Sequence, residues 1–224
     1  MRIVFWQNCL SPHQLPYIVH LMNDERVDSV VVVAGEVTHE SRRKMGWDVT
    51  SFPGLECCEV YISPTQPTIE HLLKCRVEDS YHLFSGIRGF QFVFKAFTDS
   101  LKYKLKRGLI SERPNTFAFG KANGKPLWLH KMRFLLQDRK FTPYIQSVFA
   151  MGSDAVEYFN SVYKKWSVFP FSYCTQFLSY NDVPNIIKEN ARFVFIGGLN
   201  WWKSVISILE ADNKIFNECK IGGG

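Results

Sequence analysis

The sequence lacks the marks of several special classes of protein. No window of 18 apolar residues is free of charge, so we expect no membrane-spanning helix. The first six residues run straight into a polar segment, without the apolar core of a secretory signal peptide. The six cysteines have neither the spacing of paired zinc knuckles nor that of a small disulfide framework. We therefore expect a cytoplasmic protein that needs no metal and no disulfide.

The chain also has few stretches that are poor in apolar residues, and one region of it has few acidic residues. Apolar residues make up 46% of the chain and charged residues 21%, a composition typical of a folded domain and not of a disordered one. The net charge is +6, and Glu112 is the only acidic residue between Ser100 and Gln137. Basic residues gather in two segments on either side of it, 95–107 and 125–140. The positive charge is therefore concentrated in one part of the chain.

Short apolar runs alternate with segments of helical period along the first 175 residues. One run, Val30–Val33, is four consecutive valines, which is typical of a strand buried on both faces. Between the runs, apolar residues recur every three or four positions, as on one side of a helix. The alternation predicts an α/β fold with a Rossmann-like, doubly wound parallel sheet. We expect strands at 3–6, 29–34, 58–62, 81–84, 109–111, 147–151 and 167–169, and helices at 13–22, 68–77, 90–106, 126–138 and 153–159.

The two longest expected helices, 90–106 and 126–138, combine an apolar stripe with many basic residues. We expect the stripe to face the core and the lysines to face solvent. The second helix begins at Pro126, a common first-turn residue. Its expected core-facing residues are Leu127, Leu129, Met132, Leu135 and Leu136.

The alternation of expected strands and helices is interrupted after residue 175. A polar stretch at 176–190 reads as a linker, and a new strand at 192–196 is followed by a helix at about 201–211. We therefore expect a domain at 1–175 and the truncated start of a second α/β domain at 191–224. Because the second domain stops in the middle of a unit, the chain is interpreted as a piece of a longer protein.

Ligands of open parallel sheets lie beyond the carboxyl ends of the strands, which selects the first group of candidate residues. Asn8, Ser11 and His13 follow the first strand and lead into a helix, where backbone N–H groups can meet an oxygen-rich ligand. A purely structural interpretation is also open, in which Ser11 caps the helix and Pro12 is its first residue.

Further candidates follow the fourth and fifth strands. Ser85 and Arg88 lie in a glycine-flanked turn where the guanidinium could grip a ligand, although Arg88 could equally be a solvated turn residue. Glu112, with Arg113 next to it, is a candidate base or acceptor for a sugar hydroxyl. The alternative for Glu112 is an ion pair with a neighbouring basic residue.

The expected second domain opens with a strand, a glycine turn and a lysine at the start of a helix. Backbone N–H groups and a cation at such a place suit a diphosphate. The candidates for this site are Gly197, Gly198 and Lys203.

The order of elements, ending in strand-Gly-x-Leu-x-x-x-Lys-helix at about 193–211, resembles the retaining nucleotide-sugar glycosyltransferases of GT-B architecture. That family includes enzymes that build bacterial capsule and lipopolysaccharide. Lys203 falls on the family's lysine, which with an arginine holds the donor diphosphate. Gly198 stands where the arginine is expected, and Ser204 replaces a glycine. Of the family's Asp-x-x-His-x-His pattern, Asp79 and His82 are present but Phe84 replaces the second histidine, so we assign no catalytic residue.

The resemblance implies an acceptor-side domain at 1–175 and a donor site mostly on the other domain. The family's paired glutamates, which contact the donor sugar, would lie beyond Gly224, so the chain alone is expected to be inactive. The function implied is sugar transfer from a nucleotide sugar to a glycan or lipid-linked acceptor, without a cofactor or metal. Such enzymes can rest peripherally on the inner face of an anionic membrane, and the basic segments 90–107 and 126–140 suit that contact.

The sequence leaves one alternative function open. A non-catalytic α/β domain that binds a ligand or regulates would explain the missing arginine at Gly198. The alternative for the basic helices is that their lysines are simply the solvated face of core helices. Nucleic-acid binding is not expected, since no recognition-helix or RNA-binding motif is present.

Overall fold

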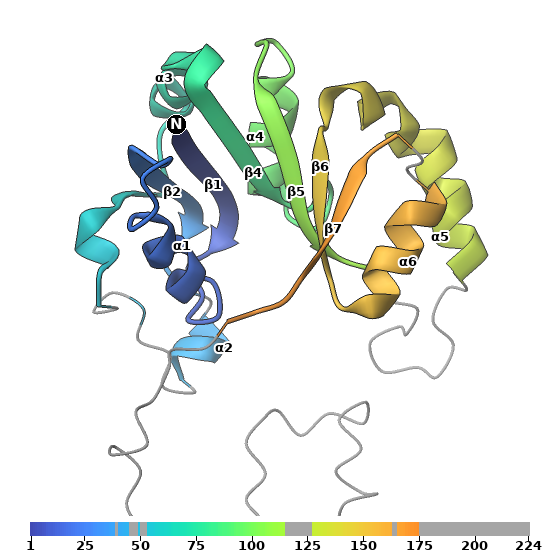
Figure 1. Cartoon of the computed structure of the whole chain (residues 1–224), viewed down its shortest axis with the longest axis horizontal. Helices are drawn as coiled ribbons and strands as arrows, with labels where there is room; N and C mark the ends of the chain where they lie inside the picture. The colour runs from blue at the N-terminus through green and yellow to red at the C-terminus, as the bar shows by residue number, and fades with distance from the viewer. Residues whose placement is uncertain (39, 45–48, 50–52, 115–126, 163–164, 175–224) are drawn as a thin grey trace, which may run out of the picture. The chain divides into compact units, whose positions relative to one another are not determined.

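Seven strands form one sheet in which every neighbouring pair is parallel (Figure 1). The computed structural model describes residues 1–38, 40–44, 49, 53–114, 127–162 and 165–174. The strand order is β3-β2-β1-β4-β5-β6-β7. The predicted Rossmann-like α/β fold is confirmed. The strands are β1 (Arg2–Cys9), β2 (Ser29–Glu36), β3 (Glu59–Ile62), β4 (Ser80–Ser85), β5 (Lys106–Glu112), β6 (Ser147–Met151) and β7 (Ser167–Phe171).

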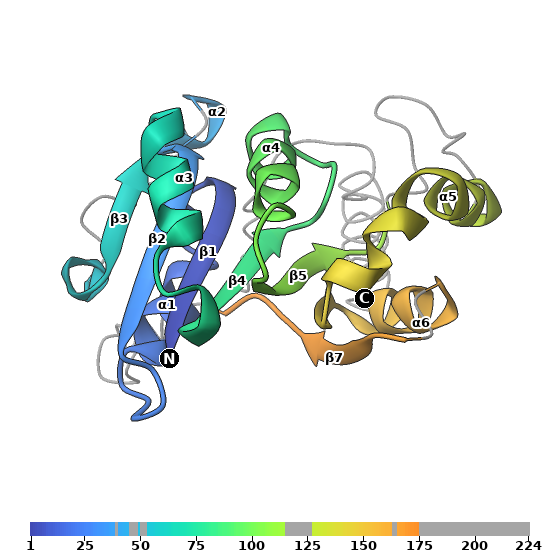
Figure 2. The ribbon, with the colours of Figure 1, turned by 90° about the horizontal axis from the view of Figure 1, so that it is seen from above.

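Helices cover both faces of the sheet, but unequally (Figure 2). The face covered by α1 (Leu15–Leu21) also carries the short helix η1 (Leu55–Cys57). The other face receives α3 (Gln66–Lys74), α4 (Gln91–Ser100) and α6 (Ser153–Val162), together with the helical turns η3 (Phe134–Asp138) and η4 (Arg139–Tyr144). The remaining elements are α2 (Glu40–Arg43), η2 (Val77–Asp79) and α5 (Leu127–Arg133), which continues into η3.

Alternate residues of the central strands supply two separate cores. Val31 and Val33 of β2 belong to the cluster under α3 and α4, whereas Val30 and Val32 belong to the cluster under α1. This alternation follows from the period of two along a strand. All four valines are buried, which confirms the prediction of a strand covered on both faces.

The strand order reverses between β1 and β4, and we call the boundary between these two strands the seam. Every other neighbouring pair of strands is consecutive in the sequence. Across the seam, Trp6 stacks on Phe84 with ring centroids 5.9 Å apart, and its indole N–H donates to Nδ1 of His82 at 3.1 Å. His82 is fully buried, and burial lowers its pKa to about 3, with the nearby charges of Arg2 and Arg107 acting in the same direction.

The expected helix at 90–106 is wrong in its second half. α4 ends at Ser100, and Lys106 and Arg107 belong to β5. Arg107 is only 2% exposed, and its guanidinium donates to the carbonyl oxygens of Ser100, Tyr103 and Leu105 and to Oγ of Ser100. These acceptors lie at the carboxyl end of α4, where a helix favours positive charge. Arg107 is therefore part of the core and not of a basic surface helix.

The expected core stripe of the helix at 126–138 is also wrong. The described members of that stripe are 37–78% exposed, while Phe134, which lies off the stripe, is buried. The chain leaves regular α-helix geometry at Phe134, where η3 widens to π-type turns before η4 tightens again. The apolar surface of α5 and η3 is consequently on the outside of the molecule. The exposed side chains are Trp128, Leu129, Met132, Leu135 and Leu136.

All described residues belong to one compact unit of the chain. Within it, no helix has the length and apolar character needed to traverse a bilayer. The predicted linker at 176–190 and the predicted start of a second domain at 191–224 lie outside the described residues.

Candidate functional site

The carboxyl ends of β1, β4 and β5 meet at one edge of the sheet because all strands are parallel. The reversal of strand order between β1 and β4 marks the place where sheets of this type hold their ligands. The sequence-predicted acceptor residues all lie at or just beyond this edge: Asn8, Ser11, His13, Ser85, Arg88, Glu112 and Arg113.

Asn8 and Ser11 are engaged by their own surroundings. β1 runs through Asn8 to Cys9, so Asn8 is a strand residue and not, as predicted, a loop residue; its amide donates to Glu36 at 3.2 Å. Ser11 Oγ accepts from the backbone N–H of His13 at 3.4 Å. α1 begins only at Leu15, with a proline in its first turn, so Pro12 precedes the helix and is not its first residue.

Ser85 and Arg88 diverge after β4. Ser85 is the last residue of the strand and is half-buried, and Gly86 follows it with a φ of 76°, a value that favours glycine. The guanidinium of Arg88 pairs with Asp138 of η3 and lies 4.8 Å from the ring centroid of Phe94. Arg88 therefore ties the loop to η3, and its charge is already compensated.

Glu112 and Arg113 also have different partners. Arg113 forms an ion pair with Asp154 at 3.2 Å, in the first turn of α6. Glu112, the last residue of β5, accepts a hydrogen bond from the hydroxyl of Tyr173 at 3.1 Å. The hydrogen-bond partner of Glu112 is thus a hydroxyl group, and the ion pair considered as the alternative is formed by its neighbour Arg113.

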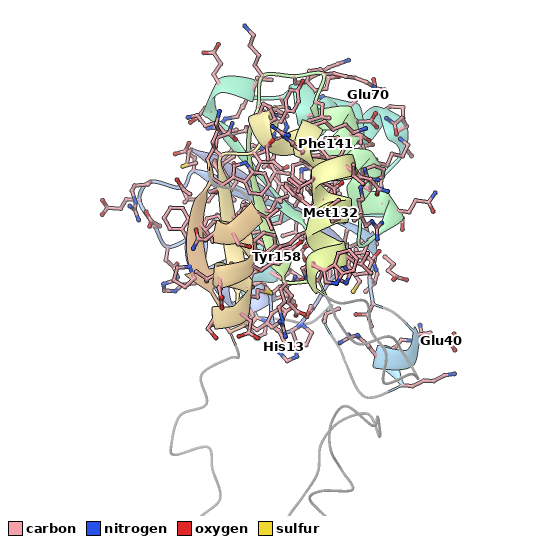
Figure 3. All side chains as sticks on the ribbon, turned by 90° about the vertical axis from the view of Figure 1, so that its right-hand side faces the viewer. His13, Glu40, Glu70, Met132, Phe141 and Tyr158 are labelled. Atoms are coloured by element: carbon pink, nitrogen blue, oxygen red, sulfur yellow. The ribbon has the colours of Figure 1, made fainter. Side chains whose placement is uncertain are left out.

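A short segment after β7 brings two distant candidates together. Residues 172–174, the crossing segment, run from β7 in front of the sheet toward α1 (Figure 1). The backbone N–H of Cys174 donates to the carbonyl of His13 at 3.3 Å, and the rings of His13 and Tyr173 lie 5.8 Å apart. His13 and Glu112 therefore meet at Tyr173. Figure 3 labels His13 at this end of the molecule.

Aromatic rings from three elements surround this meeting point. The ring of Tyr17 in α1 packs edge-on against Phe171 with centroids 5.1 Å apart, and 6.0 Å from the ring of Phe5 in β1. We call Gln7, His13, Tyr17, Glu112 and Tyr173 the Tyr173 cluster. Gln7 belongs to it because it lies two residues after Phe5, on the same face of the sheet.

Both phenols of the cluster are neutral at ordinary pH. Burial, and then the charge and hydrogen bond of Glu112, raise the pKa of Tyr173 to about 12. Burial is also the main reason that the pKa of Tyr17 lies well above its usual value. Neutral phenols can donate as well as accept a hydrogen bond. The cluster thus combines hydroxyl, amide and imidazole groups with one carboxylate.

Sequence reasoning missed Gln7, Tyr17 and Tyr173. The apolar run stops at Trp6 and so predicts no strand at Gln7, although pairing with β2 carries the strand on to Cys9. Tyr173 follows the carboxyl end of the last strand, so the same rule that selected Glu112 could have found it. Tyr17 has no signal beyond its place on an apolar helix face.

The predicted donor residues Gly197, Gly198 and Lys203 lie outside the described part of the chain. Among the residues that are described, no three His, Cys, Asp or Glu side chains are grouped so that they could hold a metal ion. Comparisons with known proteins find no match: no protein-family model, curated protein or solved structure matches this chain significantly.

Proposed function

We propose that this chain is the acceptor-side part of a glycosyltransferase. The enzyme would move a sugar from a nucleotide sugar to a glycan or lipid-linked acceptor in cell-surface polysaccharide synthesis. The observation that supports this best is Glu112, a carboxylate at the carboxyl edge of a Rossmann-like sheet that accepts a hydrogen bond from the hydroxyl of Tyr173. A carboxylate in that position can accept a sugar hydroxyl in the same way.

The donor half of the proposal rests on residues outside the described part. Charge develops on the leaving diphosphate during sugar transfer, and cations or helix N-termini lower the barrier there. We propose Lys203, with the backbone at Gly197 and Gly198, for that role. No residue is proposed as the catalytic one.

Glu112→Gln tests the acceptor side. The substitution keeps the shape of the side chain and removes its charge, so we expect kcat/KM for the acceptor to fall by roughly tenfold or more. Transfer is measured on the product of the complete reading frame, with a panel of nucleotide sugars and glycan or lipid-linked acceptors.

Glu59→Gln is the matched control, because Glu59 also accepts a hydrogen bond from a tyrosine hydroxyl, that of Tyr61 at 3.3 Å, but in β3. It should leave transfer unchanged. Equal activity of both variants would remove Glu112 from the proposal. Binding of a nucleotide sugar without any hydrolysis or transfer would instead favour the second candidate function, a non-catalytic ligand-binding or regulatory domain, which is motivated by Gly198 in place of arginine.

We also propose that the protein contacts an anionic membrane through α5 and η3. The exposed apolar side chains of this surface, the α5 patch, include Trp128 and Leu136, and Figure 3 labels another of them, Met132. Exposed apolar groups beside basic ones suit the boundary between lipid head groups and acyl chains. The basic residues on α5 and on η4, which follows η3, are Lys131, Arg133, Arg139 and Lys140.

The other basic segment contributes less than the sequence suggests. Arg107 is buried, and Lys95 and Lys102 both pair with Asp99, at 3.2 Å and 3.1 Å. Asp99 thus offsets part of the charge at 95–107, and none of the large apolar residues described in this segment is exposed, so the α5 patch is the proposed contact.

Trp128→Ser and Leu136→Ser should each weaken binding to mixed phosphatidylcholine–phosphatidylserine vesicles by about tenfold, because each removes a side chain that would enter the lipid. Binding is measured by co-sedimentation, and it should decrease as salt is added. Phe90→Ser serves as the control, since Phe90 is also an exposed apolar residue, at 46%, but lies at the start of α4. Absence of wild-type binding at low salt would end the membrane proposal.

A further inference from the structure

Among the described residues, Gln7 is the one whose side chain has two buried polar atoms without a hydrogen-bond partner. Its side chain is 1% exposed, and neither its amide nitrogen nor its amide oxygen has a hydrogen-bond partner among the described residues. An unpaired buried polar group destabilises the folded state, so native proteins almost always supply a partner, a bound water or a ligand. Gln7 lies near the carboxyl end of β1, where the sheet is expected to hold its ligand.

The hydroxyl of Tyr17 is in the same condition. It is buried and no described residue forms a hydrogen bond with it. Its ring packs against Phe5, and Phe5 and Gln7 point to the same side of β1 because they are two residues apart. Two unpaired polar groups therefore lie on one face of the sheet, next to the crossing segment that carries Tyr173.

The chemistry of the cluster selects the kind of ligand. Gln7 offers one amide donor group and one acceptor, and Tyr17 and Tyr173 offer hydroxyls. The charge in direct contact with Tyr173 is negative, on Glu112, whereas the positive charge of Arg42 acts on Tyr173 more weakly. Such a set repels a phosphate but matches a neutral group that both donates and accepts, which is the property of a hydroxyl. The rings of Tyr17, Phe171 and Tyr173 provide apolar contact area beside these polar atoms.

We propose that Gln7 and Tyr17, together with Tyr173 and Glu112, bind a neutral sugar ring through its hydroxyl groups. The crossing segment must shift for the sugar to enter, because it closes the site with two hydrogen bonds: Cys174 to His13 and Tyr173 to Glu112. This inference refines the proposed function and rests on it only in assigning the sugar to the acceptor. Binding of the sugar alone tests the inference, so a chain that transfers no sugar can still support it.

The experiment uses the 224-residue chain and ligand-observed NMR, with methyl glucoside, methyl galactoside and methyl mannoside as probes and inorganic phosphate as counter-probe. We expect at least one glycoside to bind and phosphate not to. Tyr17→Phe should weaken glycoside binding by about tenfold, the effect of one lost hydrogen bond of ordinary strength. It should leave the melting temperature unchanged or raised, because it deletes a buried hydroxyl that has no hydrogen-bond partner in the described part of the chain. Gln7→Met should act in the same way, and Tyr61→Phe in β3 should change neither quantity.

Three results would overturn the inference. The first is that no glycoside binds, or that phosphate binds in its place. The second is glycoside binding with equal affinity in wild type, Tyr17→Phe and Gln7→Met. The third is that both variants lower the melting temperature without affecting binding, which would show that Gln7 and Tyr17 hold only an internal water. Glycoside binding without transfer by the complete protein would contradict the proposed function while leaving this site intact.

Discussion

Replacing Arg107 by leucine is expected to lower the free energy of unfolding by about 3–5 kcal/mol. Arg107 donates four hydrogen bonds, among them those to the carbonyls of Tyr103 at 2.6 Å and Leu105 at 2.8 Å. Leucine fills part of the space but removes the guanidinium donors. The carbonyl of Leu105 loses the donor described for it, and the carbonyls of Ser100 and Tyr103 keep one backbone N–H each. Burial of the guanidinium is itself unfavourable, and it lowers the pKa of Arg107 to about 10. The expected loss of unfolding free energy is for that reason smaller than the summed free energies of the four hydrogen bonds.

The measurement is urea-induced unfolding followed by circular dichroism. Lys106→Leu is the matched control, because Lys106 is the preceding residue of β5 and is exposed. It should change the unfolding free energy by no more than about 0.5 kcal/mol. If Arg107→Leu were as mild as Lys106→Leu, the backbone donors that remain would suffice for these carbonyls and Arg107 would not hold α4 to β5.

Acidification is expected to destabilise the protein through His82. The pKa of His82 is about 3 in the folded protein and near 6.5 when the chain is unfolded, so between these values the unfolded state binds more protons. Stability therefore rises with pH across this window and is fully present only above about pH 7. Between pH 7 and pH 5, His82 should remove about 2 kcal/mol from the free energy of unfolding.

His82→Gln isolates this contribution. Glutamine does not titrate, and its carbonyl can accept the hydrogen bond of Trp6, so the pH dependence of the variant should be flatter than that of wild type by the amount given. The comparison is made by urea unfolding at both pH values. His71→Gln, an exposed histidine of α3, should retain the wild-type slope. A wild-type slope in His82→Gln would mean that His82 is charged in the folded protein or not buried in solution.

The fold was predictable because its signals are local. Four valines in a row and alternating apolar periods are sufficient for a parallel sheet with helices, and β6 has the same bounds as predicted. What failed depended on tertiary contacts. The helical period continues past Ser100, but Arg107 is held in β5 by carbonyls that no periodicity can reveal. Likewise, Met132 and Leu136 have the spacing of core residues although nothing described covers them.

The position of the candidate site could be predicted from the sequence, but several of the residues that form it could not. The rule for parallel sheets selected Glu112 and His13 from their positions after β5 and β1. Their common neighbour, Tyr173, lies about 60 residues beyond Glu112 in the sequence and joins them only because the crossing segment returns toward α1. Arg88 had a suitable position and was assigned a ligand role, but its partner Asp138 comes from a helical turn 50 positions away.

The seam between β1 and β4 has a consequence for the order of folding. Strands on either side of it form pairs with their sequence neighbours, and the loops that these pairs close are shorter than the one closed across the seam. Joining the two groups closes a much longer loop, since Trp6 and His82 are 76 positions apart, and long loops are entropically slower to close. The two halves of the sheet can therefore assemble before they join. The indole of Trp6 lies on the seam itself, where its fluorescence would record the moment of joining.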